Sequence, residues 1–135
     1  MTDPERDEPP EHLDRLARTV LLAAIEVHRH LGPGFLESVY ETALVLELEA
    51  RGIAVARQVP VTVMYKGRSV AESRLDLVVE DELVVELKAA DALLPIHHAQ
   101  VISYLKAGAF ELGLLINFNV PLLRDGFRRI VWHPR

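Results

Sequence analysis

The stretch LDLVVEDELVVELK, from Leu75 to Lys88, decides the fold that the sequence predicts. It reads as two β-strands joined by a turn, and the side chains of a strand alternate between its two faces. One face then carries only apolar residues, namely Leu75, Leu77, Val79, Leu83, Val85 and Leu87. The other face carries Asp76, Val78, Val84, Glu86 and Lys88. We therefore expect the apolar face to pack on the core.

The length of the turn decides whether the two carboxylates meet. A three-residue loop, Glu80-Asp81-Glu82, pairs Val79 with Leu83, and counting outward then pairs Asp76 with Glu86. Directly opposed side chains have Cβ atoms about 5 Å apart. A two-residue loop would put the carboxylates on opposite faces. The apolar pattern favours the three-residue loop, because it keeps all six apolar residues together.

Two opposed carboxylates repel each other, so this register requires something that offsets the repulsion. A divalent cation would do so, since Mg²⁺ is commonly bound by one or two carboxylates with waters and phosphate oxygens. Lys88 lies on the same face and could hold a water for in-line attack or steady the charge of a pentavalent phosphate. A solvated face, with Lys88 softening the repulsion, explains the same pattern and stays open.

Helices and further strands are predicted on both sides of this hairpin. Apolar residues recur at helical spacing from Leu13 to Leu31, and Gly32-Pro33-Gly34 ends that helix. Two more helices are predicted, from Leu36 to Arg51 and from Pro95 to Ala109. The predicted strands are Val59–Tyr65, Arg68–Val79, Leu83–Ala89, Leu112–Phe118 and Arg128–Trp132. The order α-α-β-β-β-α-β-β predicts an α+β fold with a mixed sheet.

The composition limits the class of protein. A chain of 135 residues, half of them hydrophobic, fits one domain with a real core. We expect residues 1–11 to be a disordered acidic tail and residues 12–135 to form the domain. The absence of cysteine excludes disulfides and thiolate metal sites and favours a cytoplasmic location. No apolar run approaches the roughly 20 residues of a membrane span.

The charge balance bears on nucleic-acid binding. The formal net charge is −5, which counts against binding by bulk electrostatics, because such domains are usually basic. It does not exclude an enzyme, since carboxylates that hold a metal add negative charge locally and a basic patch elsewhere can still contact phosphates.

The charged residues of the hairpin match a known signature. An Asp on one strand followed by Glu-X-Lys on the next, here Asp76 and Glu86-Leu87-Lys88, resembles the motif of the PD-(D/E)XK nuclease superfamily. Leu75 stands where the proline of that motif would be, which is a mild departure. Gly34 to Tyr40 reads G-x-x-E-x-x-Y and resembles the bacterial and archaeal GxxExxY family. That resemblance continues through Arg74–Asp76, Val85–Lys88, Ala99–Lys106 and Leu114–Phe118.

The resemblance implies a restriction-endonuclease-like core and a set of site residues. Asp76 and Glu86 would bind Mg²⁺ or Mn²⁺, and Lys88 would position the attacking water. Glu37, from the helix before the strands, would complete the outer shell of the metal or a second site. Gln100 would orient a ligand or substrate with support from Tyr104, and i, i+4 spacing puts this pair on one helix face. The implied reaction is phosphodiester hydrolysis in DNA or RNA.

Other interpretations remain open or are disfavoured by spacing. Glu37 also fits ordinary stabilisation of a helix N-terminus by a carboxylate. His97 and His98 are adjacent on a helix and point about 100° apart, so surface or capping roles suit them better than zinc binding. A second functional class is a non-enzymatic binding or assembly module with the nuclease fold. A domain of this size has little surface for gripping nucleic acid, and a homodimer would extend it.

Overall fold

The computed structural model describes residues 8–134, which form a mixed α+β fold, and this confirms the predicted fold class. Of the predicted tail, residues 1–7 lie outside the described residues, while Glu8 already pairs with Arg129 and the first helix begins at Glu11. The elements in chain order are α1 (Glu11–Leu31), α2 (Glu37–Ala50), β1 (Val55–Tyr65), β2 (Arg68–Val79), β3 (Leu83–Lys88), α3 (Pro95–Gly108), β4 (Leu112–Asn117), the 3-10 helix η2 (Leu123–Gly126) and β5 (Phe127–Val131).

The five strands form one sheet whose spatial order follows the chain order, β1-β2-β3-β4-β5. Strands β3 and β4 run parallel, with α3 connecting them, and the other three neighbouring pairs are antiparallel. β1 is an edge strand, which explains why Pro60 is tolerated in it, since an edge position does not need the missing N–H.

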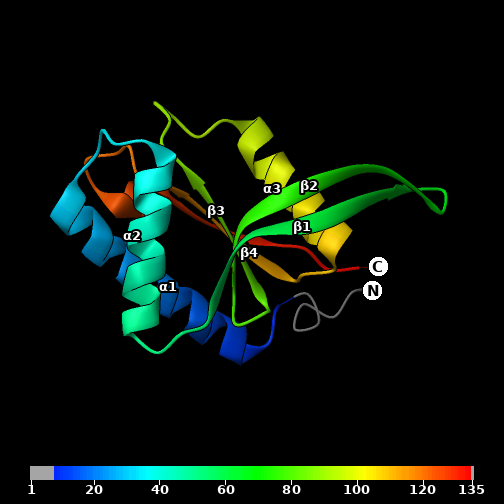
Figure 1. The fold of residues 1–135 in the computed structure, drawn as a ribbon, viewed down its shortest axis with the longest axis horizontal. Coiled ribbons are helices and arrows are strands. Elements are labelled where there is room, and N and C mark those ends of the chain that lie inside the picture. Colours follow the sequence, from blue (N-terminus) through cyan, green and yellow to red (C-terminus); the bar gives the residue numbers. More distant parts are fainter. Residues whose placement is uncertain (1–7, 135) are drawn as a thin grey trace.

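The helices cover the two faces of the sheet unequally. α1 and α2 lie side by side on one face and α3 lies on the other (Figure 1). The larger core cluster joins α1 and α2 to the apolar hairpin face, including Leu77, Val85 and Leu87. The smaller cluster lies under α3 and includes Val78, Val84 and Val101. In the described part of the chain, no helix combines the length and the apolar character that crossing a membrane requires.

The hairpin breaks strict alternation at one place, and there the expectation for Leu75 is wrong. Leu75 was expected on the face of Leu77, but it is fully buried in the cluster under α3. The regular β1–β2 pairing omits Asp76, and Gln58 on β1, the residue that would oppose it, has a φ of 51°. β2 therefore departs from its regular course at Asp76, which separates Leu75 from the face that carries Leu77.

Candidate active site

The hairpin between β2 and β3 has the register that the sequence predicts. Val79 pairs with Leu83, Val78 with Val84, and Leu77 with Val85. Glu80 and Asp81 in the loop have φ values of 52° and 60°, so the chain reverses within three residues. The regular ladder stops after Leu77 and Val85, and the next two residues outward are Asp76 and Glu86. The two carboxylates therefore lie where the hairpin opens.

Backbone hydrogen bonds hold the two carboxyl groups together. The Asp76 N–H donates to Oε1 of Glu86 at 2.9 Å, and the Leu87 N–H donates to Oδ2 of Asp76 at 2.8 Å. Each carboxyl group thus accepts an N–H from the opposite strand. Glu86 is only 5% exposed, and Val78 and Val84 beside it are buried under α3. The alternative of a solvated face is therefore wrong for this side of the hairpin.

The environment of Glu86 favours its protonated form. Burial, followed by the negative charge of Asp76, raises the pKa of Glu86 from 4.5 to about 8, while the positive charge of Lys88 opposes this shift. Two carboxylates in one desolvated site cannot both ionise cheaply, so one proton remains with the pair. At neutral pH the pair is expected to carry that proton until a cation takes its place.

Replacing Glu86 by glutamine should therefore make the stability of the metal-free protein less sensitive to pH. Because the folded pKa of Glu86 is raised, its protonation stabilises the fold fully below about pH 4.5, and this contribution is lost progressively up to about pH 8. Glu86→Gln should unfold near the wild-type temperature at pH 5 and become more stable than wild type by about 2–4 kcal/mol at pH 8.

The measurement is thermal unfolding of both proteins in EDTA across this pH range. Glu72→Gln, which removes an exposed carboxylate from the same hairpin, serves as the matched control and should give no such widening gap. A difference between Glu86→Gln and wild type that stays constant with pH would contradict the raised pKa.

The loop before α2 fixes the position of Glu37. Gly34 has a φ of 111°, a conformation that residues with a side chain rarely adopt. Tyr40, which is fully buried, donates its hydroxyl to the Gly32 carbonyl at 2.6 Å and accepts the Phe35 N–H at 3.1 Å. Its ring stacks on Phe118 with centroids 4.5 Å apart. The glycine and tyrosine of the G-x-x-E-x-x-Y stretch thus shape the loop that delivers Glu37.

Glu37 is the first residue of α2, and the pKa of its carboxyl group depends on charged residues of the β2–β3 hairpin. Burial raises its pKa, the positive charge of Lys88 lowers it, and the negative charge of Asp76 raises it again. Glu37 therefore lies within electrostatic reach of both hairpin residues. Among residues 8–134, however, no three His, Asp or Glu side chains gather closely enough to hold a metal ion. Glu37 therefore lies beside the carboxylate pair without forming such a group with it.

Two predicted site residues on α3, Gln100 and Tyr104, lie together. Nε2 of Gln100 donates to the Tyr104 hydroxyl at 3.0 Å. The pKa of Tyr104 is raised by burial first, and then by the negative charges of Glu86 and Asp76. Tyr104 therefore lies within electrostatic reach of the two carboxylates, and Gln100 is hydrogen-bonded to Tyr104. His97 has the capping role expected for it, because its Nδ1 accepts the Leu94 N–H at 3.0 Å.

The backbone around Lys88 is held by a residue that the sequence analysis did not single out. Lys88 is half-buried and pairs with Asn117 of β4, and its carbonyl accepts the Phe118 N–H at 3.0 Å. Asn117 is 1% exposed, and its side chain exchanges hydrogen bonds of 3.1 and 2.9 Å with the backbone of Ala90. A lone amide in the apolar run Leu112–Phe118 was the signal that could have revealed this role.

The donor set fits a hard divalent cation. Mg²⁺ in phosphate chemistry is usually held by one or two carboxylates, with waters and phosphate oxygens completing the sphere. Asp76 and Glu86 supply two carboxyl groups, and burial together with the charge of Asp76 raises the pKa of Glu86; a divalent charge would offset the repulsion between the ionised groups.

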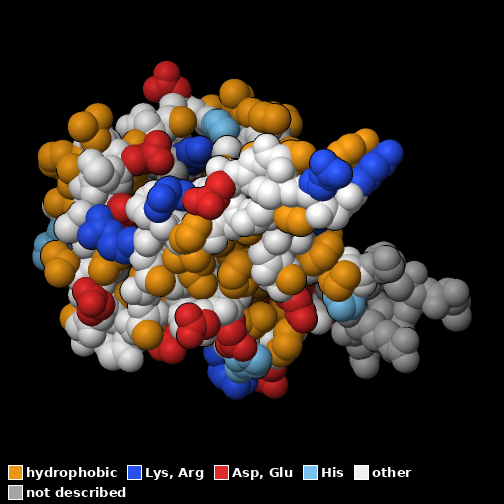
Figure 2. All heavy atoms as spheres, turned by 45° about the vertical axis from the view of Figure 1, so that its right-hand side comes forward, with side chains coloured by type: hydrophobic (Ala, Val, Ile, Leu, Met, Phe, Trp, Pro, Cys, Tyr) orange, Lys and Arg blue, Asp and Glu red, His pale blue; other side chains and the backbone are white. Residues whose placement is uncertain are grey.

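The surface around the β1–β2 hairpin carries charges of both signs. Figure 2 shows lysine and arginine side chains interspersed with acidic and hydrophobic ones on the side toward which the β1–β2 hairpin projects. This face has no extended field of positive charge. A phosphate ligand would therefore depend on local contacts near the carboxylates and Lys88 and gain little from long-range attraction.

A five-stranded mixed sheet with helices on both faces is consistent with a restriction-endonuclease-like fold. Residues 14–130 match the family model of the PD-(D/E)XK nuclease superfamily, and the chain belongs to this superfamily. Neither the curated proteins nor the solved structures include a significant match. Membership implies nucleic acid as the class of partner and a divalent metal as the usual cofactor.

Proposed function

We propose that this protein is a metal-dependent nuclease that hydrolyses phosphodiester bonds of DNA or RNA. The observation that carries the proposal is the pairing of Asp76 with Glu86 where the hairpin opens, each bound to a backbone N–H of the opposite strand. Lys88 acts electrostatically on Glu86 from the same strand. Superfamily membership supports the reaction class.

Each candidate site residue has a defined role in this proposal. Asp76 and Glu86 would hold Mg²⁺ or Mn²⁺, with the Leu87 carbonyl beside them. When bound, the cation would polarise the scissile phosphate and lower the pKa of the attacking water. Lys88 would hold that water in line with the phosphorus and offset the charge that develops on the phosphate. Glu37 would bind an outer-shell water, and Gln100, supported by Tyr104, would orient the substrate.

The direct test is cleavage of labelled single-stranded DNA, duplex DNA and RNA by the purified protein with Mg²⁺, Mn²⁺ or EDTA. We expect at least one substrate to be cut with a metal and none in EDTA. Cleavage that persists in EDTA would contradict the proposed mechanism. If no substrate is cut and calorimetry detects no Mn²⁺ binding, the nuclease proposal fails and the non-enzymatic module replaces it.

A non-enzymatic binding or assembly module is the second candidate, and one feature favours it. The β1–β2 hairpin projects beyond the sheet (Figure 1) and exposes Met64, Tyr65 and Val70 at 57%, 61% and 59%. Apolar side chains on a projecting arm suit contact with another protein. The mixed surface charge and the net charge of −5 suit this module as well. The cleavage assay separates the two candidates.

Several finer assignments belong to the same proposal. The loop geometry of Gly34 and Tyr40 supports membership of the GxxExxY family within the superfamily. We further propose that residues 12–135 act as one domain in the cytoplasm, where nucleic acid is available. A homodimer would enlarge the surface for substrate, and the mass in solution tests that part directly.

A further inference from the structure

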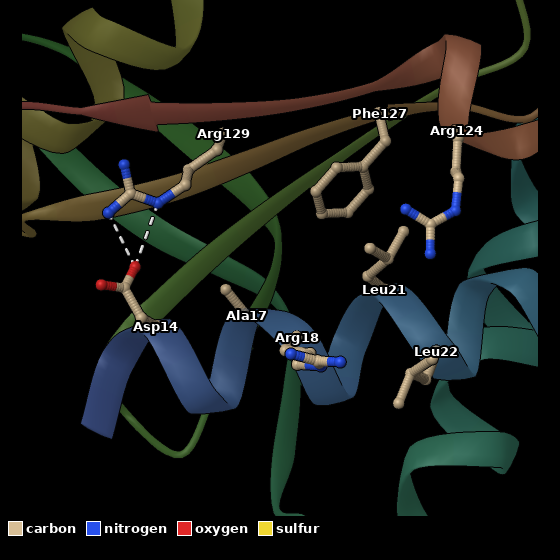
Figure 3. Close-up of a pocket in the computed structure, with 8 residues that line it drawn as sticks. All are labelled: Asp14, Ala17, Arg18, Leu21, Leu22, Arg124, Phe127 and Arg129. Atoms are coloured by element: carbon tan, nitrogen blue, oxygen red, sulfur yellow. Dashed lines mark hydrogen bonds and ion pairs between the residues drawn. The ribbon is translucent and has the colours of Figure 1, made fainter. Parts of the chain in front are cut away.

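A cavity of about 370 Å³ lies between α1 and the segment formed by η2 and β5. Its floor is apolar, formed by Ala17, Leu21 and the ring of Phe127, and three arginines, Arg18, Arg124 and Arg129, stand around it (Figure 3). Because it borders α1, it opens on the face of the sheet opposite α3. It is thus separate from the carboxylate pair. Its volume falls within the range of small-molecule sites.

The three arginines differ in how their charges are neutralised. Arg129 is paired with Asp14, with nitrogen–oxygen distances of 2.7 and 3.0 Å, and with Glu8 at 3.3 Å. Within residues 8–134, Arg18 and Arg124 have no carboxylate at ion-pair distance. Two exposed guanidinium groups without a carboxylate partner among the described residues therefore line one cavity, in a chain whose net charge is −5. An anion in the cavity would neutralise them.

The chemistry of the lining selects the kind of anion. Guanidinium groups present forked N–H donors that match the oxygens of a phosphate. The Phe127 ring lies between Arg124 and Arg129 above α1 and offers an aromatic surface for a flat group (Figure 3). Stacking of a nucleobase on an aromatic side chain is worth about 1–3 kcal/mol. A ligand with both a phosphate and a ring would use the rim and the floor together.

We propose that this cavity is a second binding site, for a nucleoside phosphate, either free or at the end of a nucleic-acid chain. Arg18 and Arg124 bind the phosphate, and Phe127 contacts the base. Arg129 also borders the site, but its ion pair with Asp14 leaves it less available than Arg18 and Arg124 to bind the phosphate. The site does not depend on the proposed nuclease activity, because none of its lining residues belongs to the carboxylate site.

The test is titration of the full chain in EDTA with adenosine 5′-monophosphate, inorganic phosphate, adenosine and a 5′-phosphorylated oligonucleotide, followed by calorimetry or NMR. Saturable binding of the monophosphate, tighter than that of phosphate or adenosine alone, is expected. Arg18→Gln and Arg124→Gln should each weaken it about tenfold or more, since each removes a charged hydrogen-bond donor. Phe127→Leu should weaken monophosphate binding at least about fivefold while leaving phosphate binding unchanged.

Two controls keep the result specific. Arg15→Gln removes an exposed arginine of α1 that pairs with Glu11 and does not line the cavity, so binding should not change. Asp76→Asn should also bind normally, which places the ligand outside the carboxylate site. Preference for the free nucleotide over the phosphorylated oligonucleotide, or the reverse, identifies the source of the ligand. No saturable binding, or equal binding by the arginine variants, would overturn the proposal.

Discussion

Replacing Lys88 by alanine is expected to lower the rate of metal-dependent cleavage by about 10²–10³-fold, the usual cost of removing one donor that stabilises developing charge. The same change should leave Mn²⁺ affinity within a few-fold of wild type. Two effects of the lost charge oppose each other. A cation is repelled less in its absence, but the Glu86 proton becomes harder to displace, because Lys88 lowers the pKa of that carboxyl group.

The measurements are single-turnover cleavage at saturating metal and calorimetric titration with Mn²⁺. Lys88 is half-buried, so Lys88→Met, which keeps an apolar stem without the charge, separates the loss of charge from the loss of packing. Lys66→Ala, at the exposed turn of the projecting hairpin, is the control for a lysine outside the site. Wild-type cleavage by Lys88→Ala would remove Lys88 from the mechanism.

The Asp76→Asn variant should lose metal binding and cleavage together. Residues that only support metal ligands typically cost 10–100-fold in affinity or activity when they are removed. A direct ligand should cost more, so we expect Mn²⁺ affinity and cleavage to fall at least about 100-fold each. Asparagine can still accept the Leu87 N–H that Asp76 accepts at 2.8 Å, so the hairpin should remain folded.

This substitution has a second consequence that a misfolded protein would not show. The negative charge of Asp76 helps to raise the pKa of Glu86, so its removal should lower that pKa. Unfolding in EDTA should then depend less on pH between about 5 and 8 than it does in wild type. Glu37→Gln provides the contrast. Glu37 lies beside the Asp76–Glu86 pair, so its replacement should weaken Mn²⁺ binding by less than Asp76→Asn does. Full Mn²⁺ affinity in Asp76→Asn would exclude Asp76 as a ligand.

Local patterns in the sequence were sufficient for the core of the candidate site. The alternation of apolar residues and the three-residue loop predicted the register of β2 and β3, and the structure confirms it. Both features are local, because side-chain direction in a strand and the length of a turn depend on neighbouring residues. The same reasoning failed for Leu75, because the β1–β2 pairing skips Asp76 and the opposing Gln58, which lies on β1 18 positions earlier in the chain.

The sequence by itself therefore determined the mixed α+β class, the hairpin register and the charged residues that this register brings together. Only the tertiary structure decided the electrostatics and the neighbours of those residues. Burial raises the pKa of Glu86, and the loop fixed by Tyr40 places Glu37 beside Asp76 and Lys88. The arginine-rimmed cavity joins α1 to residues more than 100 positions later. How strongly a side chain is desolvated, and which side chains meet at a site, depend on how elements distant in the sequence pack together. The periodicity of apolar residues along the sequence contains no information about that packing.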